Sequence, residues 1–160
     1  MKILVFSDSH GVIEDMLIGI RENEDIDMII HLGDNTIDAQ KLKKITDKEI
    51  INVKGNCDFE DIHTPLEKIL DIDGYTLFIT HGHKYNVKWD LNALYYKALE
   101  TKSHIAIFGH THIPMVEKHE GVIFLNPGSI SSPRNANKKT YGLLEIDDNI
   151  TVEIVEVKEN

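Results

Sequence analysis

The stretch Ile29-Ile30-His31-Leu32-Gly33-Asp34 decides how the rest of the sequence is interpreted. Its apolar residues predict a short buried strand that stops at a glycine and presents one carboxylate at its carboxyl end. Gly33 lets the backbone turn without a side-chain clash, which directs Asp34 toward a crevice beside the sheet. A carboxylate can bridge two cations, so Asp34 is the candidate centre of a two-metal site. Gly-Asp after an apolar strand is, by itself, also typical of an ordinary turn.

Metal-ligand side chains also follow apolar runs at four other places in the chain. In chain order these blocks are Asp8-Ser9-His10-Gly11, Gly55-Asn56-Cys57-Asp58, His81-Gly82-His83 and Gly109-His110-Thr111-His112. Residues i and i+2 of an extended backbone point to the same side, so we expect each Asp/His or His/His pair to face one crevice. A polar turn opening a helix, a tight turn at Gly55-Asn56 and a helix cap at Asp58 remain alternatives.

Hydrophobic periodicity predicts the elements between these blocks. Strands are expected over 2–7, 29–32, 49–53 and 105–108. The unbroken apolar run over residues 3–6 is typical of a strand buried on both faces, as in an α/β sheet. Helical spacing is expected over 12–24, 37–45 and 87–98. Hairpins are expected around Asp73-Gly74, Glu120-Gly121 and Asp147-Asp148-Asn149. No repeat, low-complexity segment or linker interrupts the chain, so we expect a single domain over 1–160.

Composition limits the function classes. The 160 residues carry a formal net charge of −10, which argues against nucleic acid as a main partner. The single cysteine, Cys57, excludes an intramolecular disulfide. No apolar run has the length of a signal peptide or a membrane span, so we expect a cytoplasmic protein without a membrane partner. The oligomeric state stays open.

The candidate ligands are all nitrogen and oxygen donors. This set suits Mn²⁺, Fe²⁺, Zn²⁺, Co²⁺ or Ni²⁺ better than an ion that prefers thiolates. Two such ions about 3.5–4 Å apart can orient a phosphate and activate water for an in-line displacement. A phosphatase with a cysteine nucleophile needs an arginine six residues after the cysteine, where this chain has His63.

Taken in order, the five blocks resemble the calcineurin-like metallophosphoesterase superfamily. The short length, Gly55-Asn56-Cys57-Asp58 and Asn126-Pro127-Gly128-Ser129 resemble its small prokaryotic YfcE-like phosphodiesterase subgroup. The resemblance implies an α/β fold, a four-layer α/β/β/α sandwich of two mixed sheets flanked by helices. It also implies that a hydroxide bridging two metal ions attacks the phosphate. The ligands it implies are Asp8, His10 and His112 for one ion, Asn56, His81 and His110 for the other, and Asp34 as the bridge.

The resemblance therefore predicts a metal-dependent phosphodiesterase acting on a small phosphate ester. Among the ligands, Asp34, Asn56 and His81 are the expected catalytic residues, and Mn²⁺ is the expected ion. A phosphomonoesterase acting on a nucleotide, sugar phosphate or phosphoprotein is the alternative activity, and a non-catalytic protein-binding scaffold is the alternative class.

The sequence departs from its relatives at two positions. Many of them have a histidine where this chain has Cys57, which we interpret as a small buried residue or a possible proton donor. Those that dephosphorylate proteins carry an arginine soon after Gly-Asp, and none follows Asp34 here. The candidate substrate-binding residues are Cys57, His83, Ser129 and Arg134.

Overall fold

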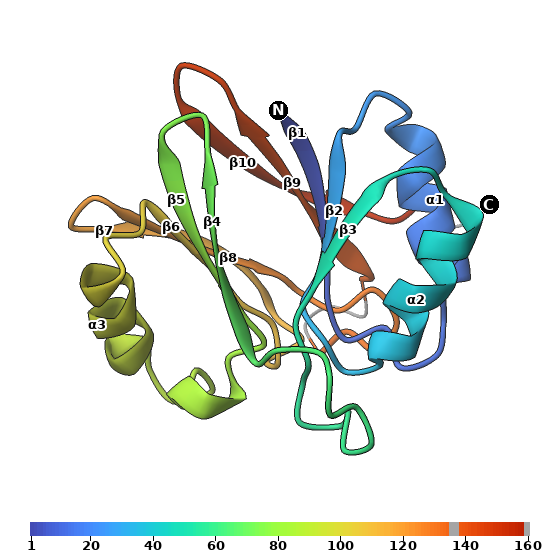
Figure 1. Ribbon diagram of the computed structural model, residues 1–160, viewed down its shortest axis with the longest axis horizontal. Coiled ribbons are helices and arrows are strands. Elements are labelled where there is room, and N and C mark those ends of the chain that lie inside the picture. The colour runs from blue at the N-terminus through green and yellow to red at the C-terminus, as the bar shows by residue number, and fades with distance from the viewer. Residues whose placement is uncertain (135–137, 159–160) are drawn as a thin grey trace.

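Two five-stranded sheets face each other in the computed structural model, which describes residues 1–134 and 138–158 (Figure 1). Sheet A has the order β10 (Ile150–Glu156), β9 (Thr140–Ile146), β1 (Lys2–Phe6), β2 (Met28–His31) and β3 (Glu49–Asn52). Sheet B has the order β4 (Glu67–Ile72), β5 (Tyr75–Thr80), β6 (Ile105–Ile107), β8 (Val122–Pro127) and β7 (Pro114–His119). The helices are α1 (Glu14–Glu22), α2 (Thr36–Ile45) and α3 (Asn92–Glu100), with a 3₁₀ turn η1 (His83–Tyr85). Helices α1 and α2 cover the outer face of sheet A and α3 covers that of sheet B, which confirms the expected four-layer α/β/β/α sandwich (Figure 1).

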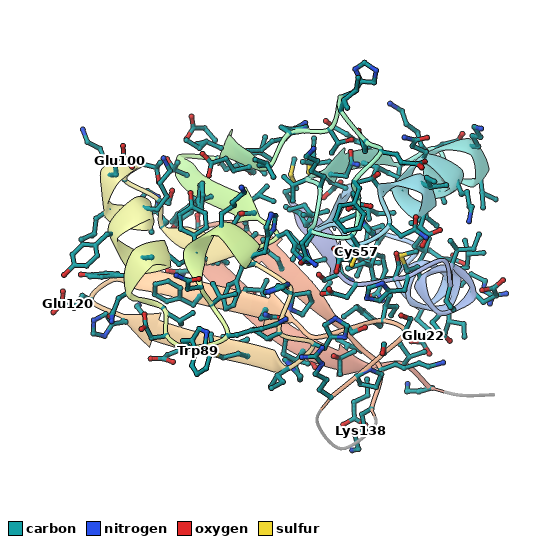
Figure 2. All side chains as sticks on the ribbon, turned by 90° about the horizontal axis from the view of Figure 1, so that it is seen from below. Glu22, Cys57, Trp89, Glu100, Glu120 and Lys138 are labelled. Carbon is teal, nitrogen blue, oxygen red and sulfur yellow. The ribbon has the colours of Figure 1, made fainter. Side chains whose placement is uncertain are left out.

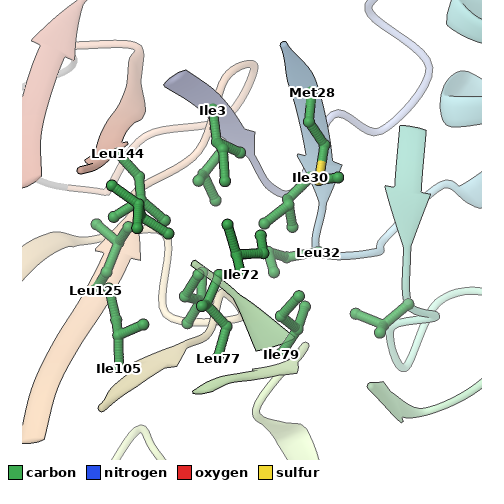
Figure 3. Packing of buried hydrophobic residues seen from close by; sticks show 14 residues of the cluster. Ile3, Met28, Ile30, Leu32, Ile72, Leu77, Ile79, Ile105, Leu125 and Leu144 are labelled. Carbon is green, nitrogen blue, oxygen red and sulfur yellow. The ribbon is translucent and has the colours of Figure 1, made fainter. Parts of the chain in front are cut away.

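Burial on both faces explains the unbroken apolar run in β1. Ile3 and Val5 belong to the core between the two sheets, in one cluster with Leu77 and Ile107 of sheet B. Figure 3 shows Ile3 and Leu77 on facing sheets of this core. Leu4 and Phe6 point the other way, into the cluster under α1 and α2. A third cluster lies between sheet B and α3. Since side chains alternate along a strand, only a strand between two apolar layers needs an apolar residue at every position.

Parallel pairing brings the carboxyl ends of the central strands to one edge of the molecule. In sheet A, β1 pairs with β2 and β2 with β3, all in parallel. In sheet B, β5 pairs with β6 and β6 with β8, also in parallel. The loops after these strands gather on the face that Figure 2 views from below.

The predicted hairpins are confirmed, but two helix starts were predicted too early. Asp73-Gly74 and Glu120-Gly121 both have positive φ at the two central positions, as a type I′ turn requires. Helix α1 begins at Glu14, whereas residues 12 and 13 were predicted to be helical. Helix α3 begins at Asn92 and not at residue 87.

A turn ahead of α3 explains its late start. Asn86, the residue before the predicted start, has a left-handed φ of 53°, and its carbonyl accepts the Trp89 N–H at 2.9 Å. Asp90 Oδ1 then accepts the backbone N–H of Asn92 at 2.8 Å, so that the helix starts there. Residues 87–91 therefore form a loop beside the carboxyl-end face. In the described part of the chain, no helix combines the length and apolarity needed to cross a membrane.

Candidate metal centre

The seven predicted metal ligands all lie in loops at the carboxyl ends of parallel strands, divided between the two sheets. Sheet A supplies Asp8 and His10 after β1, Asp34 after β2 and Asn56 after β3. Sheet B supplies His81 after β5, and His110 and His112 after β6. Because the sheets pack face to face, these loops meet at the carboxyl ends of the central strands of both sheets.

The backbone of these loops is turned, so the expected extended i, i+2 geometry was wrong. Five of the seven residues have positive φ: Asp8 (54°), His10 (45°), Asp34 (54°), His110 (69°) and His112 (60°). Such values are uncommon outside glycine and cost of order 1–3 kcal/mol each. Their concentration at one place indicates a backbone that the surrounding contacts hold in a fixed, strained form.

One group of ligand atoms surrounds Asp8. Asp8, His10, Asp34 and His112 each offer an atom that lies within 4.8 Å of the others. Asp8 Oδ1 is 3.2 Å from His112 Nε2 and 3.9 Å from His81 Nε2. The rings of His10 and His112 pack with centroids 5.4 Å apart.

A second group surrounds His81. His81 Nε2 lies 3.2 Å from Asn56 Oδ1 and 3.5 Å from Asp34 Oδ1. The His110 ring packs edge-on to the His81 ring with centroids 5.1 Å apart, so His110 and His112 belong to different groups. Asp34 clusters with Asp8 and adjoins both groups, because its Oδ1 is nearer to His81 Nε2, at 3.5 Å, than Asp8 Oδ1 is, at 3.9 Å.

The hydrogen bonds of two histidines leave lone pairs directed at carboxylates. His81 Nδ1 lies 2.8 Å from the Leu32 carbonyl and His112 Nδ1 lies 2.6 Å from the Ser132 carbonyl. A carbonyl only accepts, so each Nδ1 carries a proton. In the neutral ring, Nε2 is then an unprotonated acceptor. An acceptor so close to a carboxylate oxygen is favourable only with a proton or a cation between them.

Asp8 gives the clearest evidence that a cation fits here. Its Oδ1 is fully buried and has no hydrogen-bond partner among the described residues. A buried carboxylate oxygen without a partner is costly unless an ion compensates it. Burial raises the pKa of Asp8, but His112, His81 and Ser7 together lower it to about 2, so the carboxylate stays charged near neutral pH. The donor set of two carboxylates, one amide and four imidazoles thus fits divalent ions of the Mn²⁺ to Zn²⁺ series.

Close packing of the loops depends on glycine at two positions. A Cβ on Gly55 would lie 2.1 Å from Asp34 Oδ1, and a Cβ on Gly109 would lie 2.0 Å from Ser7 Oγ. Both contacts are impossible for a real side chain. Any larger residue at these positions would therefore displace the loop that carries a candidate ligand.

A chain of buried hydrogen bonds supports the Asp8–His10 loop, and no sequence pattern predicted it. The Gly33 N–H donates to His31 Nδ1, so His31 Nε2 carries the proton that reaches Ser9 Oγ at 2.9 Å. The Ser9 hydroxyl in turn donates to Asp38 Oδ2 at 2.8 Å. Burial lowers the pKa of His31 to about 4, which keeps this ring neutral.

Ser129, expected to contact substrate, instead holds the Asp8 loop. It is fully buried and its hydroxyl donates to the Asp8 carbonyl at 2.9 Å, as does that of Ser131 at 2.8 Å. The Ser129 oxygen also accepts the N–H of Ser132. This geometry favours support of Asp8 over the expected substrate contact.

The other three substrate candidates lie at the rim. Cys57 is exposed, which corrects its interpretation as a small buried residue. Partial desolvation of the thiol and the nearby Asp34 carboxylate raise the pKa of Cys57 to about 11. His83 packs edge-on against His110 with ring centroids 6.2 Å apart. Arg134 is exposed and its backbone N–H donates to the His112 carbonyl at 3.2 Å.

Two cavities are lined by residues that adjoin candidate ligands in the sequence. One, of about 550 Å³, borders Cys57 and is lined in part by Ile37 and Phe59. The other, of about 530 Å³, is lined in part by Thr111, between the two site histidines, and by Arg134. The wall of each cavity therefore includes a residue of a loop that carries candidate ligands.

Sequence comparisons place this chain among phosphoesterases. A model of the calcineurin-like phosphoesterase superfamily domain matches residues 1–149. The probable metallophosphoesterase YsnB of Bacillus subtilis is 34% identical over 149 residues, which cover 92% of this chain and 86% of YsnB. The phosphodiesterase YfcE of Escherichia coli is 28% identical over 172 residues, covering 92% of this chain and 89% of YfcE.

Solved structures share the fold. A predicted phosphoesterase from Streptococcus pneumoniae superimposes with a TM-score of 0.79 at 30% identity, over 97% of this chain and 88% of its own. Vps29 from Entamoeba histolytica, solved with zinc, superimposes with a TM-score of 0.78 at 23% identity, over 99% of this chain and all of its own. The second likeness concerns the fold alone.

Proposed function

This chain belongs to the calcineurin-like phosphoesterase superfamily and fits its YfcE-like subgroup, and from that membership we propose that it is a phosphodiesterase with two metal ions. The family makes it a metallophosphoesterase that acts on a small phosphate ester. The position of Asp34 carries the two-ion proposal, because this carboxylate belongs to the group around Asp8 and is also nearer to His81 Nε2, at 3.5 Å, than Asp8 Oδ1 is, at 3.9 Å.

We assign the ligands as the two groups suggest. Asp8, His10 and His112 would hold one ion, and Asn56, His81 and His110 the other, with Asp34 shared. Bound divalent ions would neutralise phosphate charge and lower the pKa of water from about 15.7 toward about 7. Mn²⁺ is our first choice, with Ni²⁺, Zn²⁺, Fe²⁺ and Co²⁺ as alternatives.

The chain's own residues orient the reaction. The Leu32 and Ser132 carbonyls fix the His81 and His112 rings with Nε2 toward the centre. Asn56 offers an oxygen without adding charge. The Cys57 thiol is neutral near pH 7, because its pKa is raised to about 11, and so it does not repel a phosphate anion.

The two cavities that adjoin the ligand-bearing loops support a diester as substrate. A diester has two organic substituents and a monoester one, and the cavities beside Cys57 and Thr111 offer space for both. A diester also carries one negative charge, whereas a monoester near neutral pH carries nearly two. No arginine follows Asp34 to compensate the second charge.

The test combines metal analysis with kinetics. We expect two metal equivalents per chain, and a higher kcat/KM for bis(4-nitrophenyl) phosphate than for 4-nitrophenyl phosphate on the Mn²⁺-loaded protein. A clear preference for the monoester would overturn the diester assignment. Fewer than one metal equivalent, without hydrolysis of either compound, would favour a protein-binding scaffold, as the likeness to Vps29 allows.

A further inference from the structure

The loop of residues 86–91, between η1 and α3, carries an aromatic side chain that the proposed reaction has not used. Trp89 is 89% exposed, and it is the only tryptophan of the chain. Exposure of so large an aromatic surface loses the free energy that burial would give, so such a residue more often marks a binding surface than a structural contact. Figure 2 shows Trp89 on the carboxyl-end face, the same face that carries Cys57.

Trp89 lines the cavity of about 530 Å³, and two other residues of its wall belong or are hydrogen-bonded to a loop that carries candidate metal ligands. Thr111 is shared between the cavity wall and the loop that carries His110 and His112. Arg134 also lines the cavity, and its backbone is hydrogen-bonded to His112. A group attached to a phosphate at the centre can therefore extend into this cavity without leaving the protein surface.

Two cations, Lys88 and Arg134, line the cavity. The backbone N–H of Arg134 donates to the His112 carbonyl at 3.2 Å, so Arg134 adjoins a loop that carries candidate ligands. Lys88 precedes Trp89 in the loop of residues 86–91. The cavity wall therefore offers positive charge to a phosphate anion.

Two carboxylates also line the cavity, but neither competes for the same place. Asp90 Oδ1 accepts the backbone N–H of Asn92 at the start of α3. Glu117 pairs in register with Phe124, two residues farther along β7 than Met115, and also borders a separate small cavity under α3. Asp90 is therefore engaged at the start of α3, and Glu117 lies on β7, outside the loops that carry the candidate ligands.

The remaining wall is apolar. Ile113 is 44% exposed, and with Met115 and Pro114 it lines the cavity beside Trp89. An indole plane beside aliphatic side chains favours a flat aromatic ring, because stacking gains contact area at little cost in conformational entropy. An alkyl group of a few atoms would leave most of this surface in water.

We propose that this cavity is a subsite for an aromatic substituent of a phosphodiester monoanion, such as the base of a nucleotide ester, with Trp89 as the stacking platform and Lys88 and Arg134 as phosphate contacts. This inference rests on the proposed phosphodiesterase function. Trp89 would thereby determine specificity without taking part in bond cleavage.

Binding can be measured without hydrolysis, because all tryptophan emission comes from Trp89. Dibenzyl phosphate and diethyl phosphate carry the same single charge and differ in their aromatic rings. Titrated into the Mn²⁺-loaded protein, dibenzyl phosphate should change the emission saturably and bind about tenfold more tightly than diethyl phosphate. Equal affinities, or emission that neither compound changes, would overturn the subsite.

Kinetics test the same residue against a fixed leaving group. Thymidine 5′-(4-nitrophenyl phosphate) and methyl 4-nitrophenyl phosphate both release 4-nitrophenol and differ only in the retained substituent. We expect wild type to have the higher kcat/KM for the thymidine ester. Trp89→Ala should lower this ratio about tenfold, chiefly through KM, and Trp89→Phe should retain most of it. Tyr96→Ala is the matched control, since Tyr96 is 68% exposed on α3 outside the cavity, and it should leave the ratio unchanged.

Lys88→Gln should raise KM for both esters several-fold, whereas Lys44→Gln on α2 should not. If Trp89→Ala has the same ratio of kcat/KM values for the two esters as wild type, the proposal is overturned. If no diester is hydrolysed but dibenzyl phosphate still changes the emission of Trp89, the phosphodiesterase assignment fails and the subsite stands. If diesters are hydrolysed without any preference for the thymidine ester, the subsite fails and the phosphodiesterase assignment stands.

Discussion

Asp58 holds Asp34 in place through the backbone, since its Oδ2 accepts the N–H of Asp34 at 3.0 Å. The same carboxylate also accepts the N–H groups of Asn35, Thr36 and Gly55, at 2.9, 2.8 and 2.7 Å. It therefore caps the start of α2 from a different loop and joins the ends of β2 and β3. The sequence suggested that Asp58 caps a helix. It did not indicate that the capped helix is α2, which begins at Thr36, 22 residues before Asp58.

Asp58→Ala should lower the free energy of unfolding by about 3 kcal/mol, because a charged acceptor of four backbone N–H groups is lost. Urea unfolding of the metal-free protein measures this change. Glu60→Ala, an exposed neighbour, is the control and should have little effect. A loss no larger than that of the control would show that water replaces the carboxylate.

Asp34→Ala should lower metal occupancy at both positions and abolish hydrolysis, since one change removes a ligand from each ion and the charge between them. Asp8→Ala should deplete mainly one ion. Elemental analysis of dialysed protein distinguishes them, with exposed Asp47→Ala as the control. Depletion of the same single ion in both variants would contradict the bridge.

Cys57→Ala should keep turnover of bis(4-nitrophenyl) phosphate within about tenfold of wild type. An activated phenol leaves without protonation, whereas a required general acid contributes roughly 10²–10⁴-fold. Steady-state kinetics on metal-replete protein measure the effect. A loss beyond a hundredfold would mean that the thiol takes part directly.

Arg134→Ala should raise KM for a diester several-fold with little change in kcat, because it removes a binding contact and leaves the ligand set intact. Arg21→Ala is the matched control. Arg21 is the only other arginine, and its Nε donates to the Leu17 carbonyl within α1. Initial rates over a range of substrate concentration separate KM from kcat, and two indistinguishable variants would remove Arg134 from the site.

Stability should fall in mild acid on account of His31. Burial lowers its folded pKa from 6.5 to about 4, so the unfolded chain binds the proton first as the pH falls. The contribution of neutral His31 to the free energy of unfolding is therefore complete above the unfolded pKa, and it is lost as the pH falls from 6.5 to about 4. Between about pH 7 and about pH 5 the loss amounts to roughly 2 kcal/mol. Urea unfolding at the two pH values should show this loss in wild type and in exposed His63→Gln, but not in His31→Gln.

The sequence predicted where the site lies better than how it is built. Apolar runs that end at Asp8, Asp34 or His81 identify the strand ends, because a strand buried on both faces is apolar along most of its sequence. The left-handed φ of His110 and His112 has no such signal, since neither residue type requires it. The separation of these two histidines into different groups therefore could not be derived from an extended backbone.

Long-range contacts were the second gap. The hydrogen bonds from His31 through Ser9 to Asp38 join three separate segments of the polypeptide. Only the folded sheet brings these segments together. Trp89 was hidden for a similar reason. The helix predicted from Val87 onward included the loop that carries Trp89, and the turn between Asn86 and Trp89 that keeps this loop out of α3 is visible only in the structure.

The division of the candidate ligands between the sheets makes any ion bound there a clamp between two layers. This chain has one cysteine, so no intramolecular disulfide can cross-link the two sheets. An ion held by Asp34 from sheet A and His81 from sheet B would serve instead, adding about 4 kcal/mol at a free concentration a thousand times its dissociation constant. Chelation would then loosen the two layers from each other first, before either sheet melts.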